Sequence, residues 1–198
     1  MKRHNIVTER RKKKIENVLK HRQPDLTVVM ENIHDPHNVS AILRSADAVG
    51  VEEVQLVYTV EKFPKLGKKS SASATKWVDR RTFDSIKECY AKLHTEGFKI
   101  YATHMGKDSK SLYQLDLTGK IALVLGNEHH GVSDEAAELA DGNFQIPMVG
   151  MIQSLNVSVA CAVSLYEAMR QRLEKDIYKK PKFNSRQLKK MFDDWAKR

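Results

Sequence analysis

The sequence predicts an α/β protein in which a parallel sheet has helices on both faces. Strand and helix signals alternate along the central part of the chain, a rhythm that is typical of repeated β-α-β units. The expected strands are nearly continuous apolar runs, as in IALVL at residues 121–125, and such runs fit strands that are buried on both sides. A length of 198 residues suffices for one domain with a substantial core.

Hydrophobic periodicity places the individual elements along the chain. Strands are expected at residues 26–31, 54–58, 98–103, 121–125 and 144–146, and helices at residues 8–20, 39–49, 85–96 and 133–140, after residue 156 and from residue 185. Ser154 or Asn156 is the expected N-cap of the fifth helix and Ser185 that of the last. Residues 61–81 are expected to form the one long irregular segment.

The connection between the strand near Phe144 and the long helix changes character abruptly. Pro147 and Gly150 interrupt the chain there, so main-chain groups between Pro147 and Ser154 have neither a ladder nor a helix partner. Because buried main-chain groups must be paired, the edge of a ligand is one candidate partner. A tight connection without a ligand is the alternative.

Charge is distributed unevenly along the chain. The net charge is +9, yet residues 1–22 and residues 170–198 each carry +7, which leaves −5 for residues 23–169. Two basic arms around an acidic centre suit a polyanionic partner such as RNA. The candidate phosphate-contacting residues lie in the first helix and in the irregular segment: Arg10, Arg11, Lys12, Lys13, Lys68, Lys69 and Lys76. A merely solvated basic helix is the alternative for the first group.

In the last helix, Leu188, Met191, Phe192 and Trp195 form an apolar stripe. This stripe is expected to be buried on the domain or on a second subunit. In the irregular segment, Trp77 is expected to pack in the core rather than to stack on a base.

Several classes of protein are disfavoured by what the sequence lacks. No apolar run approaches the length of a membrane span, and no signal peptide is recognisable, so we expect a soluble, cytoplasmic protein. Cys89 and Cys161 have no metal or disulfide spacing and are expected to be buried thiols. The histidine pairs at residues 34/37 and 129/130 lack a third ligand, so no metal is expected. Neither a dinucleotide fingerprint, a P-loop nor a hydrolase nucleophile elbow is present.

The helix expected at residues 39–49 carries the first candidate for chemistry. His37, Ser40 and Arg44 share one face of it, so Arg44 projects from a rigid element and suits an anionic or polarised oxygen. A surface arginine paired with a neighbouring carboxylate such as Asp47 is the alternative.

Three ordered segments of the chain carry a family resemblance. They read NIHDPHNVSAILRSADAVG from Asn32, ALVLGNEHHGVS from Ala122 and IPMVGMIQSLNVSVACAVSLYEAMRQR from Ile146. Together they resemble the TrmH-type members of the SPOUT methyltransferases, the tRNA guanosine 2′-O-methyltransferases, over roughly residues 15–172.

The resemblance implies a SPOUT-type parallel sheet and a C-terminal trefoil knot at about residues 121–172. It also implies a methyltransferase domain at residues 23–172 between basic helical extensions at residues 1–22 and 173–198. Members of this family are homodimers whose active site draws on both subunits. The implied reaction is 2′-O-methylation of a guanosine ribose in tRNA, at position 18 of the D-loop, with S-adenosyl-L-methionine as methyl donor.

The resemblance also implies roles for individual residues. The cofactor-binding positions are Thr103, Gly126, Ile146, Met148 and Leu155. The catalytic positions are Asn38, Arg44, Glu128, Ser154 and Asn156. Arg44 would be a general base assisted by an RNA phosphate, or else a cation that stabilises the developing alkoxide. His129 and His130 lie in a variable part of the pattern and receive no role.

Two other functions remain open at this point. One is the same reaction on ribosomal RNA, and the other is a non-catalytic RNA-binding protein of the same fold. A single helix before the first strand favours tRNA over ribosomal RNA, because many ribosomal RNA enzymes of this superfamily carry a separate N-terminal domain.

Overall fold

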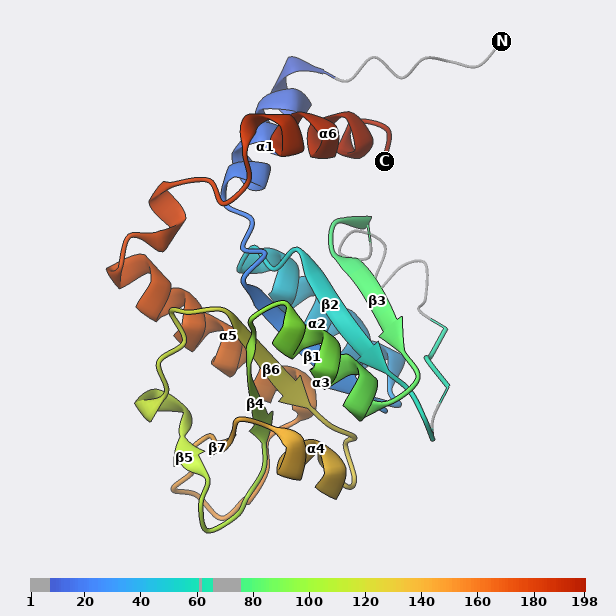
Figure 1. The fold of residues 1–198 in the computed structure, drawn as a ribbon, viewed down its shortest axis with the longest axis vertical. Coiled ribbons are helices and arrows are strands. Elements are labelled where there is room, and N and C mark those ends of the chain that lie inside the picture. The colour runs from blue at the N-terminus through green and yellow to red at the C-terminus, as the bar shows by residue number, and fades with distance from the viewer. Residues whose placement is uncertain (1–7, 61, 66–75) are drawn as a thin grey trace.

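The computed structural model describes residues 8–60, 62–65 and 76–198 and shows a sheet between two layers of helices (Figure 1). The strands are β1 (Leu26–Glu31), β2 (Glu53–Val57), β3 (Asp79–Phe83), β4 (Lys99–Thr103), β5 (Lys110–Ser111), β6 (Ile121–Leu125) and β7 (Gly142–Gln145). Within the described residues they form one seven-stranded sheet in the order β3-β2-β1-β6-β4-β7-β5. All neighbouring strands in it run parallel.

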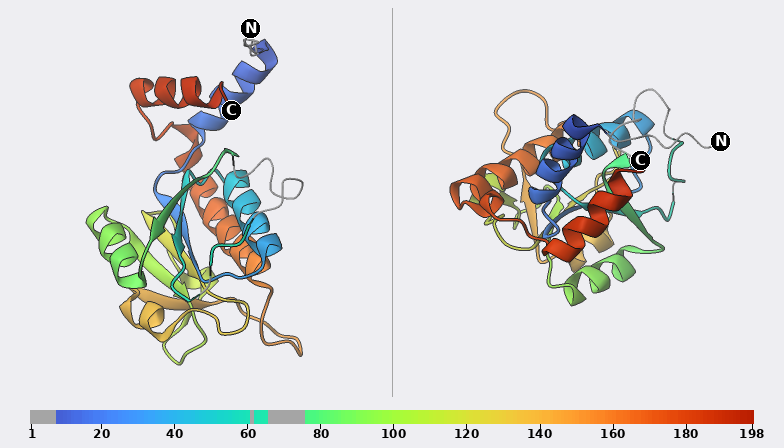
Figure 2. Two further views of the ribbon diagram at one scale, coloured as in Figure 1. Left: turned by 90° about the vertical axis from the view of Figure 1, so that its right-hand side faces the viewer. Right: turned by 90° about the horizontal axis from the view of Figure 1, so that it is seen from above.

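The helices divide between the two faces of this sheet. They are α1 (Glu9–Lys20), α2 (Pro36–Ala48), α3 (Ile86–Thr95), α4 (Asp134–Leu139), α5 (Val157–Glu174) and α6 (Ser185–Trp195), with 3₁₀ turns at Leu112–Gln114 and Ile177–Lys179. Val28 and Met30 of β1 pack with α2 and α5, whereas Val29 packs with α3 and α4, because successive strand residues face opposite sides. Figure 2 shows both helical layers. The predicted α/β class and parallel sheet are confirmed.

Several predicted boundaries need correction. Helix α2 begins at Pro36 rather than at residue 39, because Asp35 accepts a hydrogen bond from the main-chain N–H of His37 at 2.7 Å and proline fits the first helical position. The N-cap of α6 is Asn184 rather than Ser185, and it forms a capping box with Gln187. The segment expected to be irregular up to residue 81 contains the start of β3.

Helices α1 and α6 pack on each other beyond the amino ends of the central strands (Figure 1). Their shared apolar cluster contains Ile15, Leu19 and Trp195, with Leu188, Met191 and Phe192 of the predicted stripe around it. The stripe is therefore covered in part within the same chain, since Trp195 is buried and Leu188, Met191 and Phe192 stay partly exposed. Trp77 is only half-buried, and its ring lies 4.8 Å from that of Trp195, so it packs on the terminal helix rather than in the sheet core.

Candidate functional site

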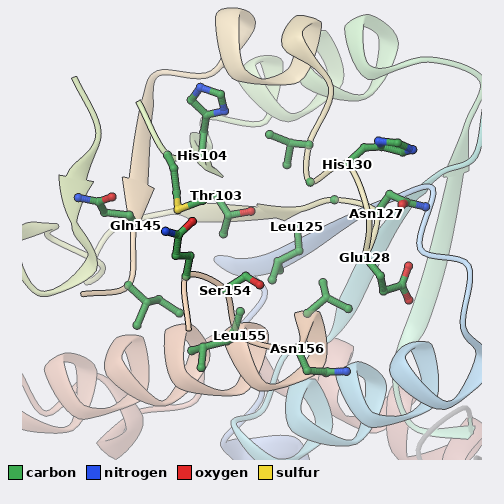
Figure 3. Close-up of a pocket in the computed structure, with 18 of the residues that line it drawn as sticks. Thr103, His104, Leu125, Asn127, Glu128, His130, Gln145, Ser154, Leu155 and Asn156 are labelled. Carbon is green, nitrogen blue, oxygen red and sulfur yellow. The ribbon is translucent and has the colours of Figure 1, made fainter. Parts of the chain in front are cut away.

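A cavity of about 770 Å³ opens at the carboxyl ends of β4, β6 and β7 (Figure 3). Its walls come from the residues that follow these strands and from the first turn of α5. All five expected cofactor positions line it: Thr103, Gly126, Ile146, Met148 and Leu155. The structure thus brings together residues from distant parts of the sequence, while their role in binding stays a prediction.

The connection before α5 borders this cavity at Met148, Gln153 and Ser154. Within the described part of the chain, no hydrogen bond involves the main chain of residues 147–154. On the opposite wall, a Cβ atom on Gly126 would lie 2.0 Å from the carbonyl oxygen of Gly131. Only glycine allows the two parts of the β6–α4 loop to approach this closely. The cavity therefore presents main chain to a ligand on at least one side.

A hydrogen-bonded network joins the three segments that carry the family resemblance. The carboxylate of Glu128 accepts hydrogen bonds from the main-chain N–H of His34 and of Asp35, both at 3.1 Å, and from Asn38 Nδ2 at 2.9 Å. Asn156 Nδ2 in turn donates to Asn38 Oδ1 at 3.0 Å. Because Asn38 is buried, this network fixes the β6–α4 loop and the start of α5 to the start of α2.

The environment keeps the carboxylate of Glu128 ionised. Burial by itself would raise its pKa, but the hydrogen bonds from Asn38 and from the main chain of His34 and Asp35 outweigh burial and lower the pKa below its usual value. Asn156 also caps α5, with its Oδ1 accepting from the main-chain N–H of Ser158 at 2.8 Å. Glu128 and Asn156 lie at one end of the cavity and Gln145 at the other (Figure 3).

Four of the five expected catalytic residues belong to this site. Glu128, Ser154 and Asn156 line the cavity, and Asn38 contacts two of them. Arg44 does not line it. Its exposed side chain lies over a separate hollow of about 370 Å³, together with His37, Ser40, Ala41 and Ser45. A single chain therefore does not place Arg44 in the cavity.

Other lining residues were missed by sequence reasoning. His104, Asn127, Gln145 and Gln153 all border the cavity. Asn127 also ties the loop down, since its Nδ2 donates to the carbonyl of Asn32 at 2.8 Å and its Oδ1 accepts from the N–H of His129 at 2.9 Å. Their location in the sequence could have identified them, because ligand sites of parallel sheets form at the carboxyl ends of strands.

The expected RNA-contacting residues have different surroundings. Arg10, Arg11 and Lys13 are exposed on α1, while Lys12 forms an ion pair with Glu9 at 2.7 Å. Lys76 is exposed beside α6, where its carbonyl accepts a hydrogen bond from Arg198. Lys68 and Lys69 lie outside the described residues.

Two arm cations are not available to RNA at all. Arg22 and Arg172 have 0% exposure, so the two arms present less positive charge than their composition suggests.

His129 and His130 also border the cavity and are exposed. Within the described ranges, no group of three or more His, Cys, Asp or Glu side chains is arranged to hold a metal ion. In the same part of the chain, no helix combines the length and apolar character that crossing a membrane requires. Cys89 and Cys161 are both buried, free thiols, as expected.

Comparison with known proteins adds an independent observation. The SpoU rRNA Methylase family pattern matches residues 25–166. The tRNA (guanosine(18)-2′-O)-methyltransferase of Thermus thermophilus is 46% identical over 191 residues, covering 96% of this chain and 98% of that protein. The solved structure of the Aquifex aeolicus TrmH/SpoU tRNA modifying enzyme matches with a TM-score of 0.89 at 40% identity, covering 96% of each chain. AviRb from Streptomyces viridochromogenes, solved with the cofactor AdoMet, matches with a TM-score of 0.69 at 27% identity, covering 79% of this chain and 64% of that one.

Proposed function

Since the chain belongs to the SpoU rRNA methylase family, we propose that it methylates the ribose 2′-hydroxyl of a guanosine in tRNA, at position 18 of the D-loop. S-adenosyl-L-methionine is the methyl donor. The observation that carries this proposal is the network of Glu128, Asn38 and Asn156, which assembles three distant sequence segments at the mouth of one cavity. Similarity over nearly the whole length of a tRNA (guanosine(18)-2′-O)-methyltransferase supports tRNA over ribosomal RNA.

The cavity suits the proposed donor. Its volume of about 770 Å³ lies within the usual range for cofactor sites, and its lining combines apolar side chains such as Ile146 and Leu155 with free main-chain groups of Met148 and Gln153. Those groups are positioned to pair with the edge of the adenine, and Ser154 and Asn156 with the polar tail. When bound, the donor supplies an electrophilic methyl group on its sulfonium.

Arg44 acts on the acceptor side of the reaction. The ribose hydroxyl is a weak nucleophile until its proton is removed or shared, and a guanidinium retains its own protons at neutral pH. Arg44 therefore stabilises the negative charge that develops on the 2′-oxygen, and the hydroxyl proton passes to an RNA phosphate or to water. Glu128 fixes the start of α2 through the hydrogen bonds that it accepts from the main chain of His34 and Asp35, so that Arg44 is presented from a rigid helix. Asn156 acts on the cofactor side.

Arg44 reaches the reacting atoms in a homodimer. Within one chain it lies over a different hollow from the donor cavity, so the complete site needs Arg44 from a second copy. Apolar side chains on α5 support such an interface, because Val159, Tyr166 and Leu173 are each close to half exposed and large exposed apolar groups commonly mark contact surfaces.

Mixing two inactive variants tests this arrangement directly. Arg44→Ala and Asn156→Ala are each expected to abolish methylation. After the two are unfolded and refolded together in equal amounts, about one quarter of wild-type activity should return, because half of the dimers are hybrids and each hybrid has one intact shared site. If Arg44 served its own chain's cavity, both sites of every hybrid would be damaged and no activity would return.

Methyl transfer itself is tested with unmodified tRNA. The protein and labelled S-adenosyl-L-methionine should place one 2′-O-methyl group on the guanosine at position 18, and Arg44→Ala should abolish this while cofactor affinity by calorimetry stays within tenfold. Methylation of ribosomal RNA in preference to tRNA, or an absence of cofactor binding heat, would refute the proposed function. Activity of Arg44→Ala within tenfold of wild type would refute the role of Arg44.

The proposal includes the trefoil knot expected at about residues 121–172. Support comes from the order of the strands, in which β6 lies between β1 and β4 and the last strand, β7, lies beyond β4, while α5 returns to pack against β6. Exposed cations on α1 and on α6, including Arg10, Arg11 and Lys13, then contact tRNA phosphates outside the catalytic cavity.

A further inference from the structure

Arg22 lies where four segments of the chain meet. It is fully buried just after α1. Its Nη1 donates to the carbonyl of Val51 at 2.5 Å, and its Nη2 donates to Asp47 Oδ1 at 2.5 Å and to the carbonyl of Trp77 at 3.1 Å. The guanidinium also stacks 4.9 Å from the centre of the Trp195 ring. This one side chain therefore connects α2, the segment at Trp77 just before β3, and α6.

The ion pair with Asp47 has a consequence for Arg44. Asp47 and Arg44 are three residues apart on α2, a spacing at which opposite charges on a helix readily pair. The structure shows Asp47 engaged with Arg22 instead. Among the residues described, Arg44 has no ion pair, and its guanidinium is exposed over its own hollow.

We propose that Arg22 is a positioning residue that withholds Asp47 from Arg44 and so leaves the Arg44 guanidinium available to the RNA substrate. The inference rests on the proposed function, in which Arg44 contacts the reacting ribose. Without Arg22, the partly exposed carboxylate of Asp47 is free to turn along the helix and pair with Arg44. Such a pair competes with the substrate for the same guanidinium and lowers kcat.

Three variants separate this role from simple stabilisation. Arg22→Met removes the partner of Asp47 and is expected to lower kcat on tRNA about two- to fivefold, the range for a partly exposed ion pair. Asp47→Asn should leave kcat unchanged even though it lowers the thermal midpoint, because it strips a buried cation of its partner. The double variant Arg22→Met/Asp47→Asn should recover the wild-type kcat. If Arg22 were only structural, kcat would follow stability and the double variant would stay impaired.

A fourth variant needs no change in the core. Ala48 is exposed and follows Arg44 by four residues, so Ala48→Glu offers Arg44 a new carboxylate while Arg22 and Asp47 stay paired. It should lower kcat to a similar extent, and the isosteric Ala48→Gln should not. Equal kcat for the Glu and Gln variants would overturn the inference even if Arg22→Met failed to fold.

The two proposals fail in distinguishable ways. If wild-type protein does not methylate tRNA, or Arg44→Ala remains active, the proposed function or the role of Arg44 falls. A different result would refute only the positioning role of Arg22. In that case the wild type is active and Arg44→Ala is inactive, but adding Asp47→Asn to Arg22→Met does not restore kcat.

Discussion

The buried arginine at the end of α5 offers the sharpest test of how this fold is held together. Arg172 has 0% exposure. Its Nε donates to the carbonyl of Leu117 at 3.1 Å, its Nη1 to Asp25 Oδ1 at 2.7 Å and to Gln23 Oε1 at 3.1 Å, and its Nη2 to the carbonyls of Asp25 and Gly119 at 3.0 and 2.6 Å. These bonds attach the long helix to the segments that enter β1 and β6.

Arg172→Met keeps most of the side-chain volume and removes all of these bonds. Breaking a buried ion pair by removing one partner costs about 3–5 kcal/mol. Asp25 retains Lys182 at 2.8 Å, which places the expected loss near the lower end, at about 3 kcal/mol. That is a large share of the roughly 5–15 kcal/mol that keeps a domain folded, so the variant should still fold with a much lower urea midpoint.

Urea unfolding at one fixed protein concentration measures this loss. Lys179→Met is the control, because Lys179 lies shortly after the same helix and its ion pair with Asp176 at 2.9 Å is exposed on both sides, so it should change stability little. A loss below about 1 kcal/mol for Arg172→Met, or an equal loss for the control, would refute the reasoning.

The pH dependence gives a second readout of the same pair. Burial alone would raise the pKa of Asp25, but Lys182 and Arg172 together lower it below its usual value. The stability this provides is present above the unfolded pKa of about 3.9 and is lost as the pH falls through the folded pKa. The difference between wild type and Arg172→Met should therefore shrink as the pH is lowered from about 5 towards 3.

Three further predictions concern the cavity, the RNA surface and the thiols. Gly126→Ala should weaken cofactor binding in calorimetry by tenfold or more, because its Cβ would collide with the Gly131 carbonyl, whereas Gly150→Ala, whose Cβ meets nothing within 4 Å, should bind normally; equal affinities would contradict the close approach. Binding of tRNA should weaken steeply with salt, and replacing Arg10, Arg11 and Lys13 by Gln should reduce the slope of log K against log salt by about 0.9 per lost phosphate contact; an unchanged slope would remove α1 from the RNA surface. Burial raises the pKa of Cys89 and of Cys161 to about 12, so a thiol reagent under mildly alkaline conditions should react with neither cysteine in native protein and with both in denaturant; rapid native labelling would contradict their burial.

The sequence predicted the sheet well where the signal was apolar. Strands such as β6 (Ile121–Leu125) are fully buried, and a continuous apolar run can only be accommodated between two helical layers. Strand β3 was missed because it lies at the edge of the sheet and pairs only with β2. Its residues Asp79 and Arg80 are exposed, so no hydrophobic alternation marks it.

The candidate site was predicted from the three segments, but their mutual geometry was not. The family resemblance identified Asn38, Glu128 and Asn156, whereas only the fold shows that they bond to one another. For Arg44 the sequence offered Asp47 as a surface partner, and this alternative is wrong because Arg22 takes that carboxylate. The sequence does not show that Asp47 pairs with Arg22 rather than with Arg44, because Arg22 looks there like any other cation of the basic N-terminal arm.

The contact of Trp77 with Trp195 can be followed by the intrinsic tryptophan fluorescence of the protein. These are the two tryptophans of the chain, and their rings lie 4.8 Å apart against the guanidinium of Arg22. Intrinsic tryptophan emission therefore originates from a single contact, where the end of α6 meets the segment just before β3. A change in the emission spectrum on adding tRNA without cofactor would report a change at the contact of Trp77 with Trp195. A change on adding cofactor alone would report a conformational effect of the cavity, which lies at the opposite end of the sheet.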